Sequence, residues 1–280
     1  MYLNLSVLQN CQAHNIYYDP FPHIIIKDAL PQNIAKVLTR NFPISESNNS
    51  LNNHRIDISA GDIGYQDYLI EEWRNFIAFH TSKEFLHEVM NIFGPTILKN
   101  NPDYFSTLNQ LYNLNVGTRK INSFEDFDIL LDTQISINSP VTQKSSVRLA
   151  HTDNTNKLFS GLLYLRQPED DSVGGNLNIC NWNSNYNYKQ KLKYYKEGLH
   201  PKHFSVYKEI EYENNVFILF LNSIDALHAV TPREITPHNR TFVNFVAELP
   251  YDIFHRNTFL KRQFIQFLRN KKSLLKRVSK

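Results

Sequence analysis

The spacing of hydrophobic positions changes about halfway along the chain. From about Leu130 onward, short apolar runs separated by polar turns predict β-strands. The expected strands are 132–138, 147–153, 159–165, 176–180, 203–207, 216–221, 227–230 and 241–248. Short strands with turn signals between them, without alternation of helices and strands, favour a double-sheet jelly roll over a doubly wound α/β fold.

Helical spacing dominates the first half of the chain. A short strand at 24–27 precedes a helix that begins after Pro31, with Ile34, Val37 and Leu38 on one side. Residues 45–55 are rich in Ser and Asn and predict a surface loop. Two further helices are expected within residues 66–99.

We expect the second of these helices to end at Gly94-Pro95. The apolar stripes of both helices are interpreted as core rather than as a cofactor groove. Residues 1–20 are expected to form a loose edge. The expected fold is therefore mostly β with flanking helices in a single domain. Residues 1–129 form a supporting α/β region, 130–249 the jelly-roll core, and 250–280 a basic helical tail.

Residues 181–202 have the character of an insertion in that core. They are rich in Asn, Tyr and Lys and include the aromatic residues Trp182, Tyr186, Tyr188, Tyr194 and Tyr195. These rings could stack on a substrate, for example on a sugar face, because long loops on a rigid scaffold often bind ligands. The competing interpretation is a loop that its own aromatic residues hold in place.

The charge is unevenly distributed along the chain. The net charge is +3, but residues 253–280 contain nine Lys or Arg and no acidic residue, so the remainder carries about −6 (3 − 9). An amphipathic basic helix at this end is a candidate contact for nucleic acid, anionic lipid, a partner or a second copy of the chain. A solvated helix end is the favoured interpretation, and we do not expect nucleic acid to be a partner.

Composition excludes several classes of protein. The hydrophobic fraction of 41%, with 19 Phe and 15 Tyr, supplies a sizeable core and excludes general disorder. Cys11 and Cys180 form no redox or metal motif, so we expect a reducing, cytoplasmic setting. We see no signal-peptide pattern and no apolar run near the roughly 18 residues that span a bilayer.

Candidate metal ligands are concentrated in two segments. His151 and Asp153 are two residues apart, so on a strand their side chains point to the same side. His228 follows the apolar strand 216–221 and a short turn, and is preferred as the third ligand over His238, His200 and His203. Two histidines and one carboxylate on one face of a metal suit non-haem Fe(II) and oxygen chemistry. A hydrogen-bonded or surface histidine is the competing interpretation for each.

The order of these motifs resembles that of the 2-oxoglutarate- and Fe(II)-dependent dioxygenases, especially the prolyl-4-hydroxylase-like branch. His151-Thr152-Asp153 is followed by Ser160–Leu165, Gly174–Leu177, Val216–Phe220, His228 and Arg240–Phe245. The resemblance covers about residues 130–249, and the opening Phe21–Lys27 is also similar. It implies Fe(II) on His151, Asp153 and His228, 2-oxoglutarate as cosubstrate, and ascorbate as a candidate reductant. It also implies hydroxylation with release of succinate and CO2, because Asp153, which halogenating relatives have lost, is present.

Arg240 is the candidate anchor for the far carboxylate of the cosubstrate. A guanidinium binds a carboxylate in two places and keeps its charge, and in the resembled family a basic residue about a dozen positions after the second histidine has this role. Tyr164 corresponds by position to a tyrosine that donates to the same carboxylate. Asn244, four residues after Arg240, points the same way along its strand. The competing interpretation for Arg240 is a surface arginine in a turn. For Tyr164 and Asn244 it is a core residue whose hydrogen bonds are satisfied.

The alternatives to a dioxygenase are a jelly-roll protein that only binds its ligand and a cupin-type metalloenzyme that does not use 2-oxoglutarate. The complete ligand triad together with Arg240 favours the hydroxylase. The prime substrate is not readable from the sequence: a peptidyl proline, a free amino acid, a sugar nucleotide and a lipid all remain open. Gly174-Gly175 is interpreted as a turn into a strand, because no helix follows it as a phosphate-binding loop requires.

Overall fold

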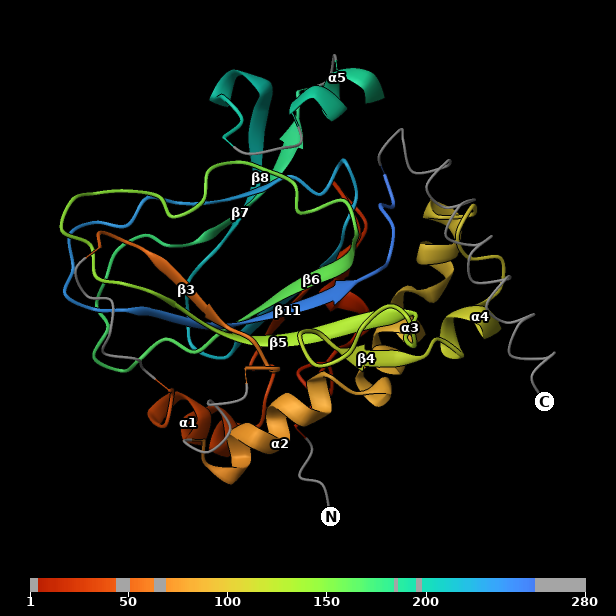
Figure 1. The fold of residues 1–280 in the computed structure, drawn as a ribbon. Coiled ribbons are helices and arrows are strands. Elements are labelled where there is room, and N and C mark those ends of the chain that lie inside the picture. Colours follow the sequence, from red (N-terminus) through yellow and green to blue (C-terminus); the bar gives the residue numbers. More distant parts are fainter. Residues whose placement is uncertain (1–4, 44–50, 63–68, 184–185, 195–197, 255–280) are drawn as a thin grey trace.

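The protein is built from a large and a small β-sheet, with helices on the outer face of the large one (Figure 1). The computed structural model describes residues 5–43, 51–62, 69–183, 186–194 and 198–254. The large sheet contains, in spatial order, β1 (Ile16–Tyr17), β2 (His23–Lys27), β9 (Val216–Leu221), β6 (Lys157–Tyr164), β11 (Arg240–Glu248), β5 (Ile129–Asn138) and β3 (Arg55–Ile58). The small sheet has the order β10 (His228–Val230), β7 (Leu177–Trp182) and β8 (Phe204–Ile210).

The double-sheet jelly roll predicted from the sequence is therefore confirmed. Strand pairings are antiparallel except that of β4 (Val116–Thr118), which runs parallel to β5. An apolar cluster that includes Ile179, Ile218 and Phe242 fills the space between the sheets. In this way each strand of the large sheet has one face toward the interior and the other toward the helices.

Strands β9 and β11 show this division most clearly, because both are buried along almost their whole length. In β9, Phe217 and Leu219 belong to the core on the helix side, whereas Ile218 belongs to the core between the sheets. The side-chain period of two produces two different cores from one apolar run.

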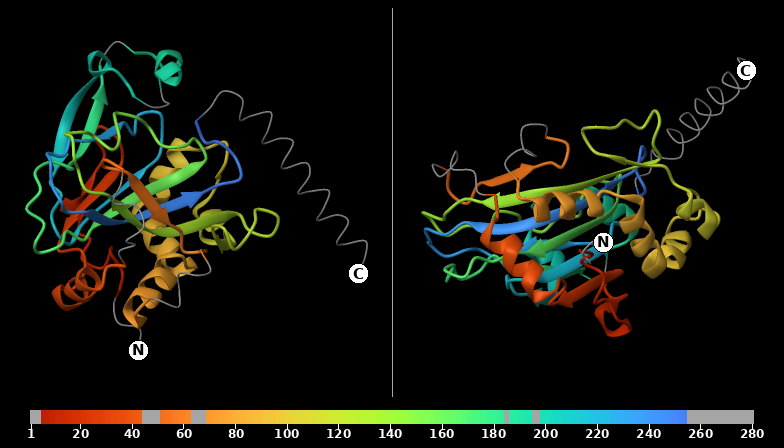
Figure 2. Two further views of the ribbon diagram at one scale, coloured as in Figure 1. Left: turned by 60° about the vertical axis from the view of Figure 1, so that its left-hand side comes forward. Right: turned by 90° about the horizontal axis from the view of Figure 1, so that it is seen from below.

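The helices cover one face of the large sheet (Figures 1 and 2). They are α1 (Gln32–Arg40), α2 (Glu71–His80), α3 (Lys83–Asn100) and α4 (Leu108–Tyr112), with a further helix α5 (Tyr188–Tyr194) beside β7 and β8, and short 3-10 turns at Ala13–Asn15 and Pro201–His203. The Ser82 hydroxyl caps α3 by accepting from the amide of Phe85. These helices confirm the apolar stripes as core, since Trp73, Phe76, Phe85 and Phe93 are fully buried.

The predicted end of α3 at Gly94-Pro95 is wrong. The helix continues through Pro95 to Asn100. Phe93 and Ile97, on either side of this pair, are fully buried, so core packing outweighs the backbone hydrogen bond that a proline removes. Gly94 lets α4 approach closely, since a Cβ there would lie 2.8 Å from the end of the Leu108 side chain, which would have to shift.

The predicted strand 147–153 is also wrong as a continuous strand. Within this segment only His151 forms an isolated antiparallel bridge, with His228, and the preceding Ser145 forms another with Arg233. Between them, the Ser146 hydroxyl donates to the carbonyls of Val230 (2.6 Å) and Arg148 (3.1 Å). A side chain thus takes the Val230 carbonyl, which a regular ladder would use.

Two segments read as irregular are in fact structured. Arg55–Ile58, the end of the predicted surface loop and its extension, forms the edge strand β3 against β5. Leu5, Val7 and Leu8 are buried in the helix-side core, so residues 5–8 are not part of a loose edge. The Asn-rich sequence before β3 concealed the short alternating run Arg-Ile-Asp-Ile.

The insertion 181–202 holds itself in place partly through its own side chains. The Trp182 indole donates to the carbonyl of Ile224 at 2.8 Å and packs on Tyr186, whose ring in turn lies against His203. Tyr195 and the predicted helix of the basic tail, apart from residues 253 and 254, lie outside the described residues. Within the part of the chain that is described, none of the helices combines the length and hydrophobicity needed to cross a membrane.

His80 gives the helix-side core a predicted pH dependence. It is fully buried among Phe76, Phe85 and Phe245, and its Nε2 accepts from the amide of Val7 at 3.2 Å. Burial lowers its pKa to about 3. Below about pH 6.5, His80 is therefore protonated in the unfolded chain but stays neutral in the folded one. The free energy of unfolding consequently falls as the pH drops below that value.

We expect His80→Gln to reduce the slope of unfolding free energy against pH by up to one proton, or about 1.4 kcal/mol per pH unit between about pH 6 and pH 4. Urea unfolding at several pH values measures this slope. The exposed His14→Gln is the matched control. Equal slopes for His80→Gln and the wild type would contradict the prediction.

Candidate metal centre

His151, Asp153 and His228 meet at one point in the structure. One nitrogen or oxygen atom of each lies within 4.8 Å of the others. His151 and His228 form an isolated antiparallel bridge, in which each amide donates to the other's carbonyl at 3.0 Å. Their rings lie 4.4 Å apart, centre to centre, and Asp153 follows two residues after His151.

Both imidazoles are oriented by backbone carbonyls. Nδ1 of His151 lies 2.7 Å from the carbonyl of Leu149, and Nδ1 of His228 lies 3.0 Å from that of Ala226. A carbonyl only accepts, so each Nδ1 carries the proton and each Nε2 keeps a lone pair. This is the arrangement by which proteins orient histidine ligands toward a metal.

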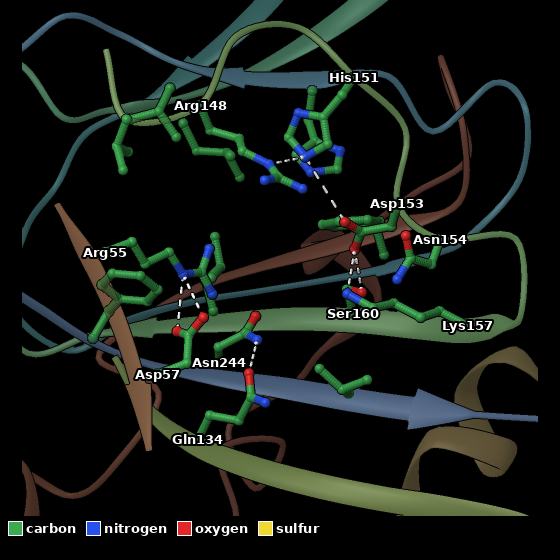
Figure 3. Close-up of a pocket in the computed structure, with 18 of the residues that line it drawn as sticks. Arg55, Asp57, Gln134, Arg148, His151, Asp153, Asn154, Lys157, Ser160 and Asn244 are labelled. Atoms are coloured by element: carbon green, nitrogen blue, oxygen red, sulfur yellow. Dashed lines mark hydrogen bonds and ion pairs between the residues drawn. The ribbon is translucent and has the colours of Figure 1, made fainter. Parts of the chain in front are cut away.

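The two carboxylate oxygens of Asp153 have different neighbours: one lies near an imidazole and the other contacts two supporting side chains (Figure 3). Its Oδ1 lies 3.8 Å from Nε2 of His151. Its Oδ2 accepts from the Ser160 hydroxyl and from the Lys157 ammonium at 3.3 Å. One carboxylate oxygen is therefore held by the protein, and the other is left facing the two histidines.

The protonation states suit metal binding. Burial, together with the positive charge of the neighbouring groups, lowers the pKa of His151 to about 3, and burial also lowers the pKa of His228. Burial alone would raise the pKa of Asp153, but Lys157, the two imidazoles and Ser160 together hold it below its usual value. At neutral pH the site offers two neutral imidazoles and one carboxylate, which fits Fe(II).

The three side chains line a cavity of about 360 Å³ between the sheets. Arg240, the first residue of β11, lines the same cavity and is 1% exposed. Its Nε donates to the carbonyl of Gly175 at 2.8 Å, and its terminal nitrogens donate to Asn138 Oδ1 (3.1 Å) and the Tyr164 hydroxyl (3.0 Å).

Aromatic rings and a glycine complete the surroundings of this guanidinium. Its central carbon lies 4.9 Å from the ring centre of Tyr164, 5.1 Å from that of Tyr212 and 4.7 Å from that of Phe242. Gly175 has a φ of +79°, and a Cβ there would lie 3.0 Å from the Arg240 side chain. Among the described residues, no carboxylate forms an ion pair with Arg240.

The two further candidates differ in position. Asn244 lies on the same face of β11 as Arg240, lines the cavity and donates to Gln134 Oε1 at 2.6 Å. Tyr164 is fully buried and holds Arg240 through its hydroxyl, but it does not line the cavity wall. Burial raises the pKa of that hydroxyl, so it stays protonated. The rival histidines are elsewhere: His238 lies 3.5 Å from Asp171, and His203 bonds to Tyr186.

Sequence reasoning missed several residues that support the site. Ser160 and Lys157 hold Asp153, and their positions at the start of β6 gave no separate signal. Arg233 is fully buried, donates to the carbonyls of Ser139 (3.0 Å) and His238 (2.7 Å), and has its pKa lowered to about 10 by burial and by the neighbouring Arg240. In the sequence, Arg233 follows a proline in a turn and resembles a surface residue.

No protein-family model and no curated protein matches this sequence. Solved structures to which this chain is similar include a prolyl-4-hydroxylase from Pseudomonas putida, at 13% identity and a TM-score of 0.41 over 81% of this chain and 92% of that one. Another is a prolyl hydroxylase from Trichoplax adhaerens in complex with a fragment of hypoxia inducible factor, at 13% identity and 0.40 over 81% and 82%. A third is HygX from Streptomyces hygroscopicus with nickel and 2-oxoglutarate bound, at 12% identity and 0.40 over 83% and 85%. At this level of similarity, function has to be inferred from the side chains of this chain.

Metal binding should depend on both oxygens of Asp153. We expect Asp153→Asn, which keeps the shape and removes the charge, to abolish Mn(II) binding measured by calorimetry. Ser160→Ala should weaken it by about 10- to 100-fold, because it removes the hydrogen bond that orients the carboxylate. The matched control is Asp225→Asn, whose carboxylate pairs with Lys191 outside the triad. Wild-type affinity in Asp153→Asn would show that the triad is not the metal site.

Proposed function

We propose that this chain is an Fe(II)- and 2-oxoglutarate-dependent oxygenase that hydroxylates its substrate and releases succinate and CO2. The observation that carries the proposal is that a His-Asp-His set and a buried arginine, which has no acidic partner among the described residues, share one cavity. The first fits Fe(II), and the second, unlike the buried Arg233, lines the cavity and can bind an anion there. A cosubstrate with two carboxylates satisfies both at once.

Nε2 of His151, Nε2 of His228 and Oδ1 of Asp153 would hold the iron. Bound there with 2-oxoglutarate, iron supplies the activation of dioxygen that no amino-acid side chain provides. The protein's part is to present three donors from one wall and to leave the cavity side open to ligands. Phe220 shields this wall, with its ring 4.7 Å from that of His228.

The hydrogen bonds of Arg240 leave it prepared for a carboxylate. A guanidinium has five N–H groups, and Gly175, Asn138 and Tyr164 accept one each from Nε and the two terminal nitrogens. One N–H remains on each terminal nitrogen. A carboxylate has two oxygens, each of which can accept from one such N–H group.

The charge of Arg240 also argues against the two alternative functions. A buried cation without an anionic partner is costly, by several kcal/mol. A cupin that does not use 2-oxoglutarate, or a jelly roll that binds only neutral sugars, binds no anion that would offset this free-energy cost. An enzyme that fixes a dicarboxylate in the cavity recovers it on binding.

The direct test is turnover of the cosubstrate. We expect the wild type, supplied with Fe(II), 2-oxoglutarate and oxygen, to form succinate slowly even without its prime substrate, and Asp153→Asn to form none. Succinate is measured by mass spectrometry. An iron-loaded wild type that forms no succinate with any substrate tested would favour the cupin or binding-protein alternative.

Arg240 should control cosubstrate affinity without affecting the metal. We expect Arg240→Ala to weaken 2-oxoglutarate binding to the Mn(II) form by about 2–5 kcal/mol, roughly 30-fold or more, because a buried charge pair loses one partner. Arg240→Lys should lie between, since an ammonium lacks the planar fork. Tyr164→Phe should cause a smaller loss.

Calorimetry with 2-oxoglutarate and, separately, with Mn(II) distinguishes these effects, and circular dichroism checks that each variant is folded. Mn(II) affinity should be unchanged in all three variants. A folded Arg240→Ala protein with wild-type cosubstrate affinity would refute the role assigned to this residue.

A further inference from the structure

The cations of the cavity wall are almost all neutralised by carboxylates. Arg55 pairs with Asp57, Arg119 with Asp132 and Glu248, Lys120 with Asp62, and Lys157 with Asp153, at 2.8–3.3 Å. Arg240 is left for the cosubstrate, as proposed above. The remaining cation is Arg148, which forms no ion pair with a carboxylate of the described residues.

The backbone of Arg148 is firmly held although its side chain is exposed. Its carbonyl accepts from the amide of Val230 at 2.9 Å and from the Ser146 hydroxyl at 3.1 Å, and its amide donates to the same hydroxyl at 3.3 Å. These bonds fix the point from which the guanidinium extends. Figure 3 shows it directed into the cavity beside the triad.

The guanidinium of Arg148 forms a hydrogen bond with a candidate metal ligand. Its Nε donates to Nε2 of His151 at 3.1 Å, which is the lone pair that a metal ion would take. The two uses of this nitrogen exclude each other, so metal binding must release the hydrogen bond. The anchored backbone nevertheless keeps the positive charge near the metal, where it also contributes to lowering the pKa of His151 and His228. Arg148 and Arg240 are thus two cations in one small cavity, and an anionic group bound between them would offset their mutual repulsion.

The depth of the two free arginines indicates which ligand supplies that anion. Arg240 is 1% exposed at the inner end of the cavity and suits the far carboxylate of 2-oxoglutarate. Arg148 is exposed, on a segment at the protein surface. A cavity of about 360 Å³ is at the small end for ligand sites, so only a small group fits beside the cosubstrate.

We propose that Arg148 binds a carboxylate or phosphate group of the prime substrate and thereby places the neighbouring carbon beside the metal. This inference rests on the proposed function and narrows its substrate class. The substrate is an acidic small molecule or an acidic group on a larger one. Neutral sugars and unmodified peptidyl proline do not meet the requirement.

The test is the binding of simple anions to the Mn(II)·2-oxoglutarate form of the protein. Calorimetry measures this binding, and no turnover is required. Inorganic phosphate and acetate are titrated separately, which distinguishes the two anionic groups. We expect at least one to bind the wild type, and Arg148→Gln to weaken that binding by about 10-fold or more. Arg148→Lys should restore part of it. Lys144→Gln, which removes one charge at an exposed ion pair outside the cavity, should match the wild type.

Affinity for Mn(II) and 2-oxoglutarate should not fall in Arg148→Gln. A loss of 2-oxoglutarate affinity in this variant would assign Arg148 to the cosubstrate and overturn the inference. Anion binding that is equal in the wild type and Arg148→Gln, or absent from both, would also overturn it. A wild type that binds Mn(II) but no 2-oxoglutarate would instead refute the proposed function from which the inference starts.

Discussion

Two backbone hydrogen bonds between His151 and His228 hold the candidate metal centre together. Side chains of residues directly opposite in an antiparallel pair point to the same side, so this one bridge brings two imidazoles from distant parts of the chain together. His228 also pairs with Ile179 in β7, which ties the bridge to the small sheet. Asp153, two residues beyond His151, is then fixed by Ser160 on β6, an interior strand of the large sheet. The triad thus lies where the small sheet passes into the large one, and its geometry depends on both.

The position of Arg240 in the anion site is set by the large sheet. Strand β11 pairs with β5 along its whole length, and this register places Arg240 opposite Asn138, one of the groups that hold its guanidinium. The metal ligands and Arg240 consequently belong to different walls of the sandwich. A ligand that joins them must reach from one sheet to the other, so under the proposed function the spacing between the sheets limits the length of the dicarboxylate. The same packing that stabilises the fold thereby contributes to specificity.

Much of this arrangement could be predicted from the sequence because it follows local periodicity. The alternation in β11 places Arg240 and Asn244 on one face, and the HxD spacing places His151 beside Asp153. The failures have a common physical cause, since they depend on contacts between distant segments. Helix α3 runs through Pro95 because of what Phe93 and Ile97 pack against, and β3 exists because β5 offers it an edge. Arg148 and Arg233 have no distinguishing local pattern, and their roles follow only from the partners that the fold brings or fails to bring to them.

Charge balance links the metal and the anion sites. Asp153 is the only carboxylate of the triad, so a divalent ion there leaves a positive excess, to which the buried Arg240 and the exposed Arg148 add. Each of these charges opposes the others until an anionic ligand binds. Metal and dicarboxylate should therefore favour each other's binding, and such coupling is reciprocal by thermodynamic necessity. The same reasoning extends to the prime substrate: after the dicarboxylate has taken Arg240, the remaining positive charge lies at the cavity mouth, where an acidic group on the substrate would complete the balance.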